Sequence, residues 1–388
     1  MLFHTHAGDS NLFPNYSFEA HMINNTPSGK LSLGSFNFIK GVAICVIILG
    51  HISLEFGIAN LTWFYPLFFL LDFLKTPFMP LFFIISGYTF KKRPAAAVLK
   101  KAAKSLLVPY GIVMIAFGFL QPLLVYLRSH NIISAVNQCI SVVLAFLLGL
   151  PIPGKIILGY KLSHCAIVWF LLAAFWGYNI LNWILRQQRI SCQIFLTIVC
   201  AGLGYLLFRL NFTYFCIPHG LIAATYFYVG YFLKKIKLLE RGLPHKWMYA
   251  VFTAIAIVYA FHGEFDLCYG KFAFFPMDYV GVIFLALLLL FVGIKIGNLD
   301  WKIFDAVHTV GAYSYWVLCI HSIEQKCLPW REFIQLTQSN PNLGFLLALI
   351  IKALIIISCC KMIKYVSKRK YRKHKKYYEQ QNLYTGLN

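Results

Sequence analysis

The sequence predicts an all-α integral membrane protein, a polytopic helical bundle of about ten transmembrane helices with both termini in the cytoplasm. Hydrophobic residues make up 60% of the 388 residues and the mean hydropathy is +0.69, whereas a soluble domain contains about 45–50% apolar residues. Apolar stretches of about 17–22 residues recur along the chain, which is the length that a helix needs to cross a bilayer. The lipid bilayer is therefore the first partner that composition predicts.

Charge decides which apolar segments are expected to cross. The segments lie at residues 36–54, 76–90, 105–127, 134–150, 166–185, 191–208, 218–233, 247–262, 279–297, 306–324 and 343–363. The basic clusters at 91–104, 234–246 and 361–376 should face the cytoplasm, because cytoplasmic loops are rich in Lys and Arg. All three clusters face the cytoplasm only if one early apolar segment does not span the membrane. We expect this segment to be 134–150, which is short and polar near its start.

Three regions follow from these assignments: a polar cytoplasmic tail at residues 1–35, a transmembrane domain at 36–365 and a basic cytoplasmic tail at 366–388. The first region contains no apolar run of the kind found in a cleaved signal peptide. We therefore expect a multi-pass protein of the cell membrane, of the bacterial inner or plasma membrane type.

The net charge of +22 would suggest a nucleic-acid partner if the protein were soluble. In a membrane protein the same excess follows from basic cytoplasmic loops, so no nucleic acid is expected. The 11 cysteines are scattered, mostly inside apolar segments. This distribution is typical of small core residues rather than of a disulfide framework or a zinc site, so no metal is expected.

Ionisable side chains inside the apolar segments are the candidates for chemistry. Lys40 and His51 lie eleven positions apart in the first segment, close to three helical turns, so they share one face at a separation of about 16 Å. A charged residue at such depth costs about 2.5–3.5 kcal/mol, which favours a functional reason for keeping it. In the predicted orientation four side chains lie in the outer halves of their helices and are expected to meet around one cavity: His51, Glu55, His321 and Glu324.

Two further motifs each have a structural as well as a functional explanation. The pair Ser86-Gly87 lets another helix approach closely, which is the simpler interpretation. Lys101 and Lys104 fit a basic stretch at the membrane surface, but two cations three residues apart also form a phosphate-binding face.

Taken together and in this order, the motifs resemble the acyltransferase-3 family of integral membrane O-acyltransferases, and most closely the branch related to fucose 4-O-acetylases. The first span of the family carries a basic residue, ten intervening residues and a histidine, as Lys40 and His51 do here. The other matches are MPLFFIISGY at 79–88, Lys101 and Lys104 before Pro109-Tyr110, WFL at 169–171, FYVG at 227–230, and Tyr313-Ser314 before His321. The resemblance covers nearly the whole chain, residues 33–365.

Two positions depart from the family pattern. Phe78 stands where the family often has His, which changes the acceptor contacts expected at that corner of the site. Lys101 and Lys104 stand where Arg is common. Because an ammonium group lacks the bidentate geometry of a guanidinium, a looser grip on phosphate is expected.

The resemblance implies an O-acetyltransferase, an enzyme that transfers acetyl from acetyl-CoA, or another acyl group from its CoA ester, to a carbohydrate hydroxyl. The acceptor would be a surface polysaccharide, a lipid-linked sugar or an exported glycoside. A sugar hydroxyl is a weak nucleophile that needs a general base, and imidazole is the natural one. His51 is therefore the expected base. Glu55 or Glu324 would orient it, and His321 would bind the acceptor or relay protons.

The acyl-CoA donor is anionic and cytoplasmic, so cations are expected at the inner mouth of the site. Lys100, Lys101 and Lys104 would contact the CoA phosphates, and Lys40 would hold a phosphate or polarise the thioester oxygen. Ser86 is a candidate for carrying the acyl group beside the donor, although direct transfer is simpler. Aromatic faces for the acceptor sugar would come from Trp169, Phe170, Tyr88 and Tyr313.

Two other functions are compatible with the sequence. A multi-pass transporter of a small solute or of a lipid-linked intermediate would also have about ten spans and polar residues at mid-membrane. Transporters often contain inverted repeats, and the two halves of the sequence show no matching pair of Gly- or Pro-broken segments. A scaffold or sensor without enzymatic activity leaves Lys40 and His51 unexplained.

Overall fold

The protein is built almost entirely of helices, which confirms the predicted all-α class. The computed structural model describes residues 36–157, 159–299 and 301–385, so the predicted N-terminal tail at 1–35 lies outside the described residues. Within these ranges the strands form two short antiparallel hairpins: β1 (Ile156–Ile157) with β2 (Tyr160–Lys161), and β3 (Phe265–Asp266) with β4 (Lys271–Phe272).

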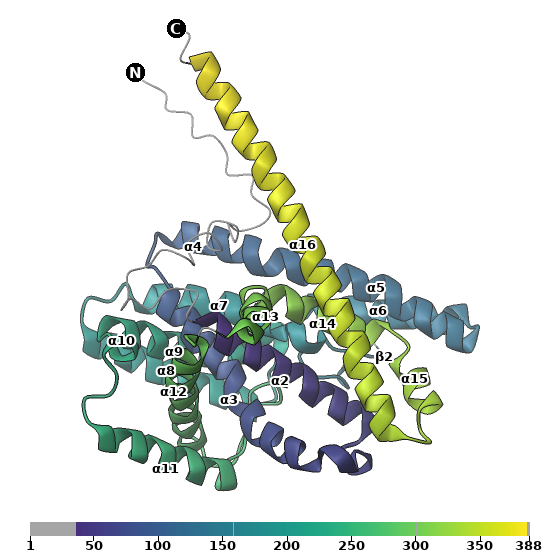
Figure 1. Ribbon diagram of the computed structural model, residues 1–388, viewed down its shortest axis with the longest axis horizontal. Helices are drawn as coiled ribbons and strands as arrows, with labels where there is room; N and C mark the ends of the chain where they lie inside the picture. The colour runs from purple at the N-terminus through teal and green to yellow at the C-terminus, as the bar shows by residue number, and fades with distance from the viewer. Residues whose placement is uncertain (1–35, 158, 300, 386–388) are drawn as a thin grey trace.

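The helices pack into one bundle, from which the C-terminal part of α16 extends (Figure 1). The longer ones are α2 (Asn37–Phe56), α3 (Tyr65–Thr89), α5 (Val108–Ser129), α6 (Ile132–Leu147), α7 (Trp169–Ile184), α8 (Ile190–Arg209), α9 (Ile217–Lys235), α11 (Lys246–His262), α12 (Met277–Gly297) and α16 (Pro341–Thr385). The shorter ones are α4 (Ala95–Ala102), α10 (Leu238–Arg241), α13 (Lys302–Ala312), α14 (Ser314–Cys327) and α15 (Trp330–Leu336). A π-helical turn, Ala103–Leu107, continues α4 directly into α5.

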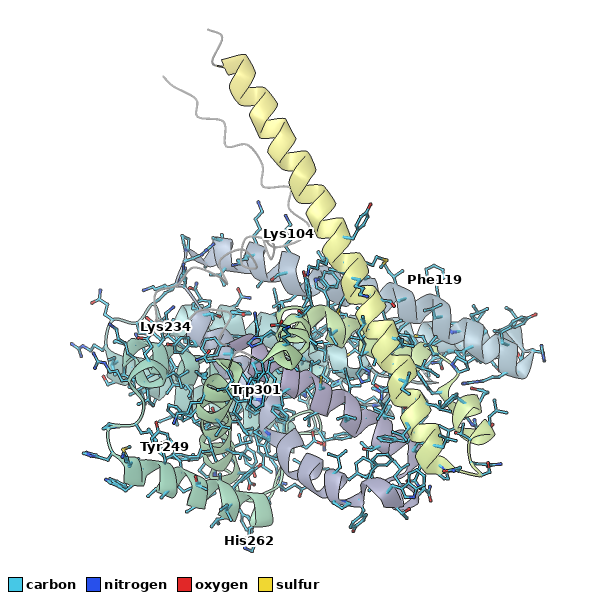
Figure 2. All side chains as sticks on the ribbon, in the orientation of Figure 1. Lys104, Phe119, Lys234, Tyr249, His262 and Trp301 are labelled. Carbon is cyan, nitrogen blue, oxygen red and sulfur yellow. The ribbon has the colours of Figure 1, made fainter. Side chains whose placement is uncertain are left out.

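Many of these helices are suited to a membrane. Among the described residues, seven are long and apolar enough to cross it: Asn37–Phe56, Ala95–Ser129, Ala166–Ile184, Ile190–Arg209, Tyr214–Lys235, Met277–Gly297 and Pro341–Tyr365. Shorter apolar helices occur at Pro77–Thr89, Ile132–Leu147 and Lys246–Tyr259. Large apolar side chains project outward, as Phe119 does with 74% of its surface exposed (Figure 2). The chain is a multi-pass membrane protein, and ten as the number of crossings stays a prediction.

Helix α6, which corresponds to the segment predicted not to span, folds back along α5 (Figure 1). The Tyr110 hydroxyl near the start of α5 donates a hydrogen bond to the Phe146 carbonyl oxygen near the end of α6, at 2.7 Å. Helix α7 continues in the same sense, because the Arg93 amide just before α4 donates to the Asn182 side-chain oxygen near the end of α7, at 3.3 Å. Helices α6 and α7 in succession therefore run antiparallel to the continuous α4–α5 helix. That residues 134–150 do not span the membrane stays a prediction.

Residues 306–324, predicted as one apolar segment, belong to two helices. Helix α13 ends at Ala312 and α14 begins at Ser314. Tyr313 between them has φ −104° and ψ 11°, which lies outside the α-helical region. Helix α14, which carries His321, is therefore a separate element from the α13 helix that packs on α2.

Glycines set the closest helix contacts. A Cβ atom at Gly87 in α3 would lie 1.9 Å from the Phe227 carbonyl oxygen of α9, and one at Gly230 in α9 would lie 1.9 Å from the Ile84 carbonyl oxygen of α3. The two backbones therefore touch, which is the packing that the Ser86-Gly87 pair indicated. Contacts of the same kind, with Gly311 of α13 against Asn37, hold α13 on α2.

Gly230→Ala should destabilise the folded protein by about 1–3 kcal/mol or more, because neither helix backbone can move without repacking the core. Thermal unfolding in detergent measures the effect. Gly111→Ala in α5 is the matched control, since a Cβ there meets nothing within 4 Å. A melting temperature for Gly230→Ala equal to that of the control would contradict the close α3–α9 contact.

Helix α16 runs through the predicted domain boundary at residue 365 without a break. Its apolar part, Pro341–Tyr365, packs beside α2 and α14. The remainder extends away from the bundle (Figure 1). Successive turns of α16 therefore pack against α2 and α14, the helices that carry the two predicted catalytic histidines.

Candidate active site

A cluster of polar side chains lies where α2, α14 and α16 meet. His51 on α2 and His321 on α14 are neighbours, with ring centroids 5.7 Å apart. His321 is fully buried, whereas His51 keeps part of its surface exposed. The structure thus brings together the two histidines that the sequence placed at a common depth.

Glu324 is the centre of the hydrogen bonds in this cluster. Its Oε1 atom lies 2.5 Å from Nδ1 of His321, one helical turn earlier. The Nζ atom of Lys352 on α16 lies 3.1 Å from Oε1 and 2.9 Å from Oε2. The indole Nε1 of Trp330 donates to Oε2 at 2.9 Å. Because the carboxylate is bound by donors on both oxygens, its orientation is fixed, and Nδ1 of His321 carries the hydrogen of their bond.

The second nitrogen of His321 is available for chemistry. Nε2 is buried and has no hydrogen-bond partner within the described residues. When Nδ1 donates, Nε2 of a neutral imidazole is the proton acceptor. An imidazole held by a carboxylate at one nitrogen, with the other nitrogen unpaired, is the arrangement used for general acid–base catalysis.

Lys352 connects α16 to both histidine-bearing helices. Only 1% of its side chain is exposed. Besides its ion pair with Glu324, its Nζ atom lies 3.8 Å from Oε2 of Glu55, one turn beyond His51 on α2. The ammonium group also sits 4.0 Å from the centroid of the Trp330 ring. The cluster therefore contains two carboxylates around one buried cation, beside two imidazoles.

The family model described as an acyltransferase domain matches residues 33–361, which include every member of this cluster. The chain belongs to the acyltransferase-3 family. No curated protein matches the chain, and no solved structure does either. The family inferred from the sequence motifs is confirmed, and the protein is a membrane acyltransferase. Its place in the fucose 4-O-acetylase-like branch stays a prediction.

The lysines predicted to contact the acyl-CoA lie at the edge of the acyltransferase, as Figure 2 shows for Lys104. Lys100 and Lys101 are exposed on α4, and Lys104 is partly exposed in the π-helical turn. The Tyr315 hydroxyl donates a hydrogen bond to the Ser105 carbonyl oxygen, which ties this turn to the first residues of α14. The basic surface therefore lies at the N-terminal end of α14, and His321 lies near the middle of the same helix.

Lys40 and Ser86, two other predicted site residues, lie outside the polar cluster. Lys40 is partly exposed on α2, three turns before His51, which corresponds to about 16 Å along the helix. Ser86 is partly exposed on α3, next to the close contact of Gly87 with α9. Their roles toward the donor stay predictions.

The aromatic residues predicted to bind the acceptor have protein partners. The ring of Trp169 lies 5.1 Å from that of His219, between centroids. Phe170 stacks on Phe83 at 4.6 Å. The Tyr88 hydroxyl donates a hydrogen bond to Glu240 at 3.2 Å. Tyr313 occupies the break between α13 and α14. Acceptor binding by these four side chains stays a prediction.

Two members of the cluster were not assigned to the site from the sequence. The sequence did contain evidence for a functional role of Lys352, because it is a lysine inside the apolar segment 343–363. The same argument singled out Lys40. Nothing in the sequence indicated such a role for Trp330, since it follows Pro329 in a connection without a recognisable motif. Only the packing of α15 and α16 against α14 brings these two side chains to Glu324.

His164 lies in the connection before α7, near Lys326 at the C-terminal end of α14. Burial, followed by the nearby Lys326 ammonium, lowers the pKa of His164 to about 4. The side chain is therefore uncharged at neutral pH and adds no positive charge to this region. In the described part of the chain, no group of three or more His, Cys, Asp or Glu side chains is arranged to hold a metal ion.

Proposed function

We propose that this acyltransferase transfers an acetyl group from acetyl-CoA to a hydroxyl group of a carbohydrate. The observation that carries the proposal is the buried His321–Glu324–Lys352 arrangement, with an unpaired imidazole nitrogen, beside the partly exposed ring of His51. Such a cluster handles a proton, which is what the transfer of an acyl group to a hydroxyl requires.

The difference in exposure divides the roles of the two histidines. His51 is the ring that an acceptor can reach, so it takes the proton of the attacking hydroxyl, as the sequence predicts. His321 is fully buried behind it and held by Glu324, so it stabilises or relays that proton. The hydroxyl oxygen attacks the thioester carbonyl carbon, the carbon–sulfur bond breaks, and CoA leaves as a thiolate that recovers the proton.

The donor approaches from the basic surface around α4. The CoA phosphates are attracted by Lys100, Lys101 and Lys104, which carry positive charge at the protein surface. The link between the π-helical turn and α14 places this surface at one end of the helix that carries His321. From Tyr315 to His321 the helix rises by about 9 Å, a distance that the extended arm of CoA can bridge.

The activity can be measured with the purified protein in lipid nanodiscs, with labelled acetyl-CoA and a panel of oligosaccharides and lipid-linked sugars. We expect release of CoA that depends on the acceptor, and an acceptor heavier by one acetyl group. Mass spectrometry of surface glycans from cells with and without the gene identifies the natural acceptor. Accumulation of a solute in vesicles without any CoA release would contradict the proposal and favour a transporter.

Lys101→Ala/Lys104→Ala should raise the KM for acetyl-CoA about tenfold and change the KM for the acceptor little, because only the donor carries phosphates. The KM of the unmodified protein should also rise with salt, since ionic strength screens exposed charges within about 8 Å at 0.15 M, and the double variant should respond less. Lys234→Ala/Lys235→Ala removes the same charge from an exposed pair on α9 and is the control. Equal donor KM values in both double variants would exclude the α4 surface as the phosphate site.

A further inference from the structure

Lys352 is the least expected member of the site. It lies in the middle of the apolar part of α16, where nothing in the sequence motifs assigns it a role, and it is buried almost completely. A charged residue inside a membrane-spanning helix is costly unless it is paired, and such residues usually mark a functional site. Its partners are the residues that surround the two histidines.

We propose that Lys352 is a positioning residue that fixes Glu324 on His321 and balances its charge, so that the histidine pair stays unprotonated and ready to accept a proton at neutral pH. The inference rests on the proposed function, because it concerns the proton transfer of that same site. It adds a residue from α16 to a site that the motifs place on α2 and α14.

The geometry shows how Lys352 fixes the carboxylate. Nζ lies within hydrogen-bonding distance of both oxygens of Glu324, and the indole of Trp330 contacts the same carboxylate and lies under the ammonium group. Glu324 cannot rotate without breaking contacts on both sides. Its Oε1 atom is therefore held at Nδ1 of His321, which selects the ring orientation and leaves Nε2 as the acceptor nitrogen.

Charge balance gives the second part of the role. A carboxylate without a counter-ion beside an imidazole draws a proton onto the ring, and a protonated ring cannot act as a base. The ammonium of Lys352 offsets the charge of Glu324. Among the described residues, the other charged groups near the pair are Glu55 on α2 and Lys326 at the end of α14. They are one of each sign, so they do not replace Lys352.

A purely structural role explains the Lys352–Glu324 ion pair less well. Replacing a buried ion pair by apolar residues is often neutral or stabilising, so α14 and α16 could be joined more simply by apolar packing. The ion pair is instead placed at the carboxylate that contacts the imidazole of His321. This placement is what a role in proton transfer requires.

The pH dependence of acetyl transfer distinguishes the two roles. In Lys352→Met we expect kcat at neutral pH to fall about 100-fold with the KM for acetyl-CoA within about threefold, and the acidic midpoint of the rate profile to move up by about one pH unit. Glu324→Gln should move that midpoint down, because it leaves the ammonium unopposed. Lys352→Arg should keep the midpoint in place, and Lys361→Met, an exposed lysine on the same helix, is the control.

If Lys352→Met does not fold, Glu324→Gln and Glu324→Gln/Lys352→Met form the decisive pair, since they differ only in the lysine. The double variant should have its midpoint at higher pH than Glu324→Gln alone. Identical midpoints in these two proteins, or a Lys352→Met protein with only a lower melting temperature and an unmoved profile, would overturn the positioning role. Absence of acetyl transfer from the unmodified protein would instead overturn the proposed function, and this inference with it.

Discussion

His51→Ala should abolish acyl transfer while the protein still inserts in the membrane and folds. The substitution removes a partly exposed imidazole from a largely apolar helix, so the fold loses a polar side chain rather than a buried apolar one. General-base catalysis contributes about 10²–10⁴-fold to a rate, and we expect a loss in that range in kcat with the KM for acetyl-CoA almost unchanged. Initial rates of CoA release, normalised to the amount of monodisperse protein, measure the effect.

His262→Ala, at an exposed histidine at the end of α11 (Figure 2), is the matched control and should keep the full rate. His321→Ala should be severe but less complete, because His321 acts on the proton after His51 has taken it. More than about a tenth of the original rate in His51→Ala would make general-base catalysis there untenable. A larger loss in His321→Ala than in His51→Ala would exchange the two roles.

The parts of the fold and site that follow local rules were predictable. Composition and segment length predicted a helical membrane protein, and the motif order predicted the acyltransferase-3 family. Helical spacing also placed Glu55 one turn from His51, and Glu324 one turn from His321. The structure shows the His321–Glu324 pair in direct hydrogen-bonding contact.

The parts that depend on which helices pack together were not predictable. A soluble helix has a polar face that shows which side is buried, but a membrane helix is apolar on both its lipid side and its core side. Lys40 and Lys352 therefore look alike in the sequence, as single lysines in apolar segments. Only the position of α16 against α14 makes Lys352 a partner of Glu324, while Lys40 lies three turns away from His51 on its own helix. The break at Tyr313 was missed because no Gly or Pro stands at that residue.

Glu324→Ala should destabilise the folded protein more than any other single substitution in the cluster. It leaves the ammonium of Lys352 buried without its closest counter-ion and leaves Nδ1 of His321 without its acceptor. The Trp330 indole loses the carboxylate but keeps the Glu324 carbonyl oxygen as an acceptor. Removing one partner of a buried ion pair costs about 3–5 kcal/mol. Thermal unfolding in detergent, followed by size-exclusion chromatography, should show a large fall in the melting temperature.

Two companion variants test whether the loss comes from the stranded charge. Glu324→Ala/Lys352→Met removes both charges and should recover most of the stability, because apolar replacement of a whole buried pair is often neutral or stabilising. Glu332→Ala breaks an exposed pair, in which Arg128 lies 2.6 Å from Glu332, and should have a much smaller effect because solvent screens such pairs. A double variant as unstable as Glu324→Ala would mean that the lost side-chain packing, and not the unpaired ammonium, is what the fold cannot tolerate. Recovery of stability without recovery of acyl transfer would separate the two consequences of the ion pair: the fold needs its charges to be balanced, whereas the chemistry needs the carboxylate itself at His321.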